Sequence, residues 1–166
     1  MAGEIVLRQA TRDDAQALAE LSNESSAFYA RLAPELFAEG DHTGFAEWIA
    51  DTWDDGPGTL ALVAEIDGAI AGYLEATIQE PEPWARFFGS RDLRERRLFV
   101  NAVLTVARYR RRGVATVLVE RAEDWGRERG ATVVLLDTWA DSPVSVPFWE
   151  QRMRYRRRSI VFRKQL

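Results

Sequence analysis

Four arginines lie within five residues at Arg108–Arg112, in the stretch VARYRRRGVATVLVERAEDWG. Gly113 follows directly and precedes apolar residues at helical spacing, so we expect a helix to begin there. The first backbone N–H groups of a helix have no acceptor within the helix, and with arginine side chains beside them they bind phosphates. Adjacent guanidinium groups at such a positive helix end also repel one another by roughly several tenths of a kcal/mol. The segment therefore predicts an anion site.

Two other interpretations of these arginines stay open, a solvated helix end and a nucleic-acid surface. The second would also use the cluster Arg152–Arg158. Against it, the protein has a net charge of −4 and a pI near 5.2, and it carries no helix-turn-helix, zinc or RNA-binding motif. We therefore expect no nucleic-acid partner. Alternation along a strand sends Arg154, Arg156 and Arg158 to one face, and we interpret them as a solvated edge or an interface rim.

Charge is divided unevenly along the chain. Residues 1–90 carry a net charge of −13 and residues 91–166 a net charge of +9, which together give −4. Either this asymmetry places an anionic ligand on the C-terminal half and a cationic one near the N-terminal half, or the opposite charges only attract each other.

Composition narrows the class of protein. The 166 residues include no cysteine, which excludes thiol catalysis, zinc–cysteine sites and disulfides. The length suits a single domain over residues 1–166. Because the sequence has neither a long apolar run nor a signal peptide, we expect a cytoplasmic protein with no membrane partner.

The N-terminal half predicts strands and helices in alternation. An alternating strand over residues 4–10 leads into a helix over residues 11–32, in which Thr11 is the cap and Asp14 follows three residues later. A short helix is predicted over residues 45–53. Residues 59–78 form two apolar runs that meet at Asp67–Gly68, which is typical of a β-hairpin.

The C-terminal half continues the pattern after an irregular loop over residues 80–96. The predicted elements are a strand over 97–106, a helix from Gly113 to Gly130, a strand over 131–139, a short helix over 144–153 with Ser142 as its N-cap, and a last strand over 154–166. The nearly all-apolar strand 131–139 is typical of a central strand covered on both faces. This order predicts a mixed α/β sheet with helices on its faces.

The arrangement resembles the GNAT superfamily of acyl-CoA-dependent N-acyltransferases. The motif R-x-x-G-x-A at Arg110–Ala115 is weak alone, but it follows a strand and opens a helix, as the family's pyrophosphate loop does. The hairpin at Asp67–Gly68, the strand with AVLTV and the segment SPVSVPFWEQRMRY fall in the family's order. The resemblance implies a mixed, mostly antiparallel sheet of about six to seven strands, flanked by about four helices.

The resemblance also implies acetyl-CoA as co-substrate and no metal. In the family, a splayed fourth strand leaves backbone groups free for the pantetheine arm, and loop amides hold the pyrophosphate. The matching positions are Leu104, Thr105 and Val106 for the arm, Arg110, Arg111, Arg112, Gly113, Val114, Ala115 and Thr116 for the pyrophosphate, and Phe148 and Trp149 for the aromatic pair beside the cofactor. Leu104 and Val106 are also expected to pack in the core.

The chemical groups depart from the family's pattern. The resemblance implies that the N–H of Val106 polarises the thioester carbonyl. The usual tyrosine on the sulfur side is replaced by Trp149, and Tyr155 is the nearest substitute in the sequence. Where some members place a base, this chain has Asn101, which can orient a water but cannot accept a proton, so Glu75 is the best carboxylate that remains.

Taken as an enzyme, the chain is expected to move an acetyl group from acetyl-CoA to a primary amine through direct attack and a tetrahedral intermediate. The acidic N-terminal half favours a cationic small molecule or a peptide or protein terminus as acceptor. The missing tyrosine motivates the alternative, a catalytically weak module that binds or senses acyl-CoA. Arg154 replaces a glycine that the family prefers, which predicts an altered turn. The last helix and strand could support a homodimer.

Overall fold

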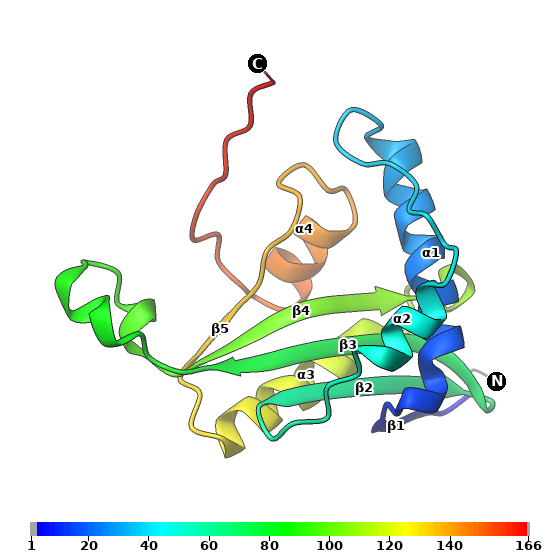
Figure 1. The fold of residues 1–166 in the computed structure, drawn as a ribbon, viewed down its shortest axis with the longest axis horizontal. Coiled ribbons are helices and arrows are strands. Elements are labelled where there is room, and N and C mark those ends of the chain that lie inside the picture. The colour runs from blue at the N-terminus through cyan, green and yellow to red at the C-terminus, as the bar shows by residue number, and fades with distance from the viewer. Residues whose placement is uncertain (1–2, 166) are drawn as a thin grey trace. The chain divides into compact units, whose positions relative to one another are not determined.

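A five-stranded sheet is the centre of the fold in this computed structural model, which describes residues 3–165. Two compact units make up the chain, residues 1–135 and residues 136–166. The sheet belongs to the first unit, and its strands are β1 (Ile5–Gln9), β2 (Thr59–Ile66), β3 (Ala69–Gln79), β4 (Arg97–Thr105) and β5 (Val133–Leu135). They lie in chain order; only β4 and β5 pair in parallel (Figure 1).

The hairpin of β2 and β3 is confirmed at the predicted turn. Asp67 and Gly68 both have positive φ, 52° and 75°, as a two-residue turn that follows the twist of its strands requires. The hairpin brings β3 into the middle of the sheet, where it pairs with β4 on its other edge.

Helices cover both faces of this sheet. The helix α3 (Val114–Glu128) packs close against β3, because a Cβ at Gly72 would lie 2.6 Å from Val114 Cγ1. The neighbouring Tyr73 points to the opposite face, where it packs with Leu18 of α1 (Ala15–Leu32). The short helix α2 (Phe45–Asp51) packs beside α1. None of the helices among residues 3–165 is long and apolar enough to cross a membrane.

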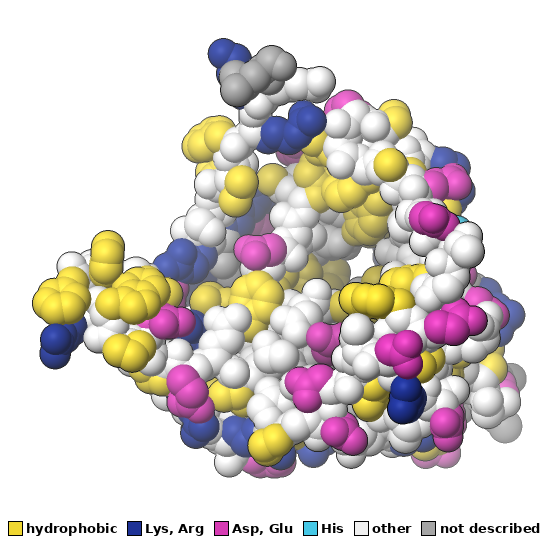
Figure 2. All heavy atoms as spheres, in the orientation of Figure 1, with side chains coloured by type: hydrophobic (Ala, Val, Ile, Leu, Met, Phe, Trp, Pro, Cys, Tyr) yellow, Lys and Arg dark blue, Asp and Glu magenta, His cyan; other side chains and the backbone are white. Residues whose placement is uncertain are grey.

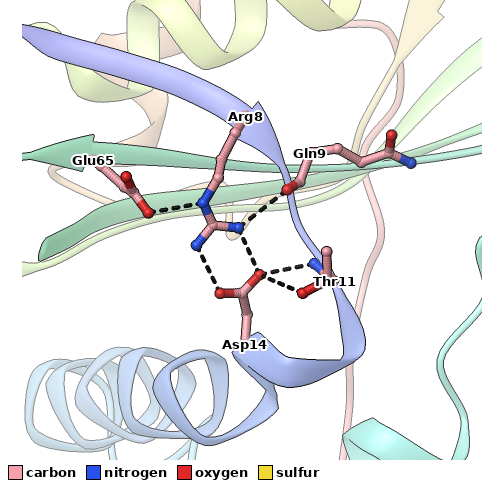
Figure 3. Close-up of polar contacts among 5 residues, drawn as sticks. All are labelled: Arg8, Gln9, Thr11, Asp14 and Glu65. Carbon is pink, nitrogen blue, oxygen red and sulfur yellow. Dashed lines mark hydrogen bonds and ion pairs between the residues drawn. The ribbon is translucent and has the colours of Figure 1, made fainter. Parts of the chain in front are cut away.

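The start of α1 is held by an ion-pair cluster as well as by the predicted cap. The N–H of Thr11 donates to Asp14 at 2.8 Å, which confirms the capping box. Arg8 then donates to both oxygens of Asp14 at 2.8 Å and to Glu65 at 2.8 Å (Figure 3). These contacts lower the pKa of Asp14, chiefly through the Arg8 hydrogen bond.

The predicted loop 80–96 forms an ordered lobe between β3 and β4. It contains two 3-10 turns, Pro83–Phe87 and Asp92–Arg94. The side chain of Arg94 donates to three backbone carbonyls of the lobe, and Arg97, only 3% exposed, donates to two more. Figure 2 shows hydrophobic side chains gathered over this lobe, of which Trp84, Phe87 and Phe88 are exposed.

The expected number of strands is wrong, because five strands occur among residues 3–165 instead of six to seven. Residues 154–165 of the predicted last strand have no regular structure, and Leu166 lies outside the described residues. Alternation marks a segment that could pair, but a strand exists only where a neighbouring strand accepts its hydrogen bonds.

The predicted strand 131–139 is shortened to β5, and its predicted central position is wrong. β5 is last in the strand order and all three of its residues are only partly buried. Its ladder with β4 ends at the pair Phe99–Leu135, and the second unit begins at Leu136. The apolar run therefore spans the end of an edge strand and the start of another unit.

The second unit contains the predicted short helix in a modified form. The helix α4 (Ser145–Pro147) continues as a π-helical turn over Phe148–Arg152. Ser142 Oγ accepts the N–H of Ser145 at 3.1 Å, but the N-cap residue of α4 is Val144, two positions after the predicted one. Proline within the helix is a physical reason for the irregular turn, since Pro147 has no N–H to donate.

Candidate active site

The predicted helix start after the arginine run is confirmed, and it is open. Gly113 precedes α3 with φ of 89°, and no side chain caps the helix. A Cβ at Gly113 would meet nothing within 4 Å, so the space beside this residue is open. Val114, 1% exposed, is buried in the core, whereas Gly113 before it is partly exposed. Ala115 and Thr116 complete the first turn.

Two arginines beside this helix start have no carboxylate to neutralise them. Arg111 and Arg112 are exposed, and no ion pair joins either of them to an acidic residue among residues 3–165. Arg112 lies over the Tyr109 ring, with its guanidinium carbon 5.6 Å from the ring centre. Arg111 has φ of 63°, a strained conformation for a residue with a side chain. Their positive charge is available to an anion.

Arg110 differs from its two neighbours, because the protein engages its donors. Its guanidinium lies 3.9 Å from Glu24 of α1 and 4.8 Å from the centre of the Phe28 ring. The backbone N–H of Arg110 donates to Ala107 O at 3.2 Å, and the backbone N–H of Ala107 donates to the Glu24 carboxylate at 2.6 Å. Arg110 therefore ties the loop to α1, and Arg111 and Arg112 remain the candidate phosphate donors. Glu24 could not be predicted from the sequence, since nothing local links it to the loop.

The end of β4 has an open edge. Beyond Phe99, β4 has no ladder with β5. The N–H of Val106 donates to Ala71 O at 3.0 Å, so it is paired inside the sheet, and the prediction that it polarises a thioester is wrong. Antiparallel pairing alternates along a strand, which directs the N–H groups of Val103 and Thr105 away from β3, toward the open edge. In agreement, Arg110 Nε approaches Thr105 O at 3.4 Å on that side.

The side chains of Leu104 and Val106 pack against the apolar cluster under α1. Their expected place in the core is confirmed. Because side chains on this face are committed to packing, a ligand at this edge would contact β4 through its backbone.

The structure brings Glu75 and Asn101 together, which the sequence did not indicate. The Asn101 amide donates to Glu75 Oε1 at 2.9 Å, and Thr77 Oγ1 donates to Asn101 Oδ1 at 3.5 Å. A β-bulge makes this contact: Glu75 pairs with Ala102 and the next residue pairs with Val100, so Asn101 is the extra residue. The pair lies beside the point where β4 loses its β5 partner.

Sequence analysis also missed Tyr73, which donates to Glu75 Oε2 at 3.0 Å. Burial, with Glu75 close by, raises the pKa of Tyr73. The phenol therefore stays protonated and acts as a donor. The spacing of two residues on one strand, which puts Tyr73 and Glu75 on the same face, is the signal that could have found it.

The predicted aromatic residues of the second unit contact one another. Phe148 and Trp149 pack edge to face at 4.9 Å between ring centres, and Trp149 lies 5.1 Å from Tyr155. Tyr155 N–H donates to Trp149 O at 2.9 Å across a turn in which Arg154 has φ of 64°. Glycine adopts this conformation without strain, which explains why the family prefers glycine where this chain has Arg154. Glu75 and Asn101 belong to the first unit, and Tyr155 to the second.

The sequence was also compared with models of protein families. The result agrees with the site, which combines an uncapped helix start after an arginine-rich loop with a neighbouring strand that has an open edge. The model of the acetyltransferase (GNAT) family matches residues 16–155. The chain belongs to the GNAT acetyltransferase family. Among curated proteins, none matches this GNAT sequence.

Solved structures share the GNAT fold over nearly the whole chain. An aminoglycoside N-acetyltransferase, AAC(6')-Iy, solved with CoA, is 20% identical over 100% of this chain and 98% of its own, with a TM-score of 0.65. An acetyltransferase from Trypanosoma brucei is 21% identical over 98% and 100%, with a TM-score of 0.66. A transcriptional regulator from Bacillus halodurans C-125 is 18% identical over 98% and 100%, with a TM-score of 0.72. Such identities show a common fold.

Proposed function

We propose that this protein transfers an acetyl group from acetyl-CoA to a primary amine of a cationic small molecule or of a peptide or protein terminus. The observation that carries the proposal is the open start of α3, where Gly113 leaves free space and no side chain caps the helix. We also propose that residues 1–166 form one acetyltransferase domain, since the family match extends through both units.

The residues at this helix start fit a diphosphate. The N–H groups of the partly exposed Gly113 and Ala115 supply donors, and the helix start supplies the positive end of the helix dipole. Arg111 and Arg112 add positive charge that no carboxylate among residues 3–165 neutralises. The CoA complex of the aminoglycoside N-acetyltransferase with this fold supports coenzyme A as the source of the diphosphate.

The open edge of β4 suits the pantetheine arm and the thioester. Acetyl-CoA supplies the acetyl group. The N–H groups of Val103 and Thr105 take the place of Val106 as the donors that can stabilise a developing oxyanion. Val103 is the nearer of the two to Glu75, because it follows Ala102, the pairing partner of Glu75.

Glu75 is the proposed general base, and Asn101 orients it. The carboxylate lies partly exposed on the face of the sheet that α1 and α2 cover. A carboxylate there attracts a cationic acceptor and can accept a proton from its ammonium group. Tyr155 stays a prediction for the sulfur side, tested by the rate of thiolate release in Tyr155→Phe.

Binding and turnover are tested separately. Titration calorimetry with acetyl-CoA, with CoA and with desulfo-CoA should show micromolar or tighter binding that needs the diphosphate. Release of free thiol should then be measured with polyamines, aminoglycosides and amino-acid derivatives, and we expect a cationic amine to raise it at least tenfold above hydrolysis. No affinity for any CoA species would contradict the proposal.

A specific observation favours one alternative, a module that binds acyl-CoA without transferring it. Trp149 occupies the position where the family usually has a tyrosine, and indole has no hydroxyl to protonate a thiolate. The same titration distinguishes the alternatives. Tight binding of acetyl-CoA without thiol release for any amine would support the binding module.

A further inference from the structure

Three polar side chains on β3 and β4 form one connected network around Glu75. Tyr73 OH donates to Glu75 Oε2 at 3.0 Å, and the Asn101 amide donates to Glu75 Oε1 at 2.9 Å. Each of the two carboxylate oxygens thus accepts one hydrogen bond. Thr77 supports Asn101 from the outer end through a longer contact of 3.5 Å. The strands that carry the network are neighbours in the sheet (Figure 1).

The two donors are fixed by different means. Tyr73 is 8% exposed and packs in the apolar cluster with Leu18, Leu21 and Val63, so its ring has little freedom. Asn101 is fixed by the β-bulge, which leaves it without a pairing partner on β3. A free glutamate side chain explores many rotamers, and a two-point clamp removes that freedom before any acceptor arrives.

We infer that Tyr73 is a positioning residue of the transferase: its hydroxyl holds Glu75 in one orientation, so that the carboxylate receives the proton of the ammonium acceptor. In this step an N–H bond of the ammonium breaks, an O–H bond forms on Glu75, and the electron pair stays on nitrogen for attack on the thioester. The inference rests on the proposed function.

The test is Tyr73→Phe, which removes one oxygen atom and keeps the ring. We expect kcat to fall about tenfold and KM for acetyl-CoA to stay within twofold. Thermal unfolding and acetyl-CoA titration confirm that the variant is folded. Thr59→Val is the control, since it removes a hydroxyl of β2 that donates to Asp54 outside this network, and its kcat should change less than threefold.

A double-mutant cycle with Glu75→Gln decides whether Tyr73 acts through Glu75. In the Glu75→Gln protein, the further change Tyr73→Phe should alter kcat less than twofold, because the group that it positions is gone. Equal effects of Tyr73→Phe in both backgrounds would overturn the inference, as would full activity of Glu75→Gln. These results would leave acetyl transfer intact, whereas a wild-type protein without turnover would overturn the proposed function and this inference with it.

Discussion

Two helices of the first unit begin beside arginines, and the two sets of arginines differ in whether carboxylates neutralise them. Before α1, Arg8 is neutralised by Asp14 and Glu65, and Asp14 also accepts the N–H of Thr11. Before α3, Arg111 and Arg112 have no carboxylate partner among residues 3–165, and no side chain caps the helix. At the first start, carboxylates pair with the arginine and with the Thr11 N–H, whereas at the second the two arginines remain for a ligand.

The contrast shows that the role of an arginine depends on whether the protein itself supplies acceptors for its guanidinium group. Arg110 makes the point inside the loop itself, since Glu24 and the Phe28 ring convert it into a support of the structure. Three adjacent arginines therefore divide into one that stabilises the loop and two that can bind an anion.

The largest expected effect comes from Gly113→Ala. Its φ of 89° and that of Gly130, 77°, are both in the left-handed region, so alanine costs roughly 1 kcal/mol of stability at either position. Only at Gly113 does the new methyl enter the proposed diphosphate space. Titration calorimetry should show a loss of about 100-fold in acetyl-CoA affinity for Gly113→Ala, close to 2.7 kcal/mol.

Gly130→Ala is the control, because it lies at the other end of α3 and should keep its affinity. Equal acetyl-CoA affinities of the two variants would contradict a diphosphate site at the start of α3.

Arg8→Ala should act on stability and leave binding unchanged. Removal of the guanidinium leaves Asp14 and Glu65 without their cation, at an expected cost of about 2 kcal/mol in the free energy of unfolding. Urea denaturation measures it. Arg12→Ala is the matched control, since its ion pair with Asp51 is exposed on both sides and should contribute less than about 0.5 kcal/mol.

Arg111→Ala and Arg112→Ala should show the reverse pattern. Each is expected to weaken acetyl-CoA binding about tenfold, close to 1.4 kcal/mol, and to reduce its dependence on salt, without loss of stability. Arg127→Ala provides the comparison, because Glu123 and Asp124 already neutralise that arginine. An unchanged affinity for both loop variants would place the ligand elsewhere.

Arg154→Gly should raise stability, by about 1 kcal/mol, because Arg154 holds φ of 64° that glycine adopts without strain. Arg111→Gly relieves a φ of 63° and should gain similar stability while it weakens binding. Denaturation and titration of both variants therefore separate a strained arginine at a turn from one kept for a ligand. A loss of stability in Arg154→Gly would contradict this view.

The smallest effect is a dependence on pH at the satisfied helix start. Arg8 lowers the pKa of Asp14, so the carboxylate contributes stability that is complete above its unfolded pKa, about 3.9, and is lost as pH falls through the folded value. Stability measured from pH 6 to pH 2 should therefore fall less steeply in Arg8→Ala than in the wild type. Parallel curves would show that the pair does not couple to protonation.

Much of the first unit could be predicted from the sequence. The capping box at Thr11, the turn at Asp67–Gly68 and the start of α3 at Gly113 are formed by residues within a few positions of one another, so their chemistry is local. The predicted strand over residues 154–166 failed for the opposite reason. Its alternation was present, but a ladder needs a partner that the segment itself cannot supply.

By itself, the sequence determined the alternating elements, the helix start with its arginines, and the resemblance that the family match confirmed. Only the tertiary structure decided which donors are satisfied. Glu65 reaches Arg8 from 57 residues away, Glu24 reaches Ala107 from 83, and Asn101 reaches Glu75 from 26 through a bulge. Hydrogen bonds and ion pairs act over a few ångströms in space, so partners distant in the chain are set by folding and not by spacing.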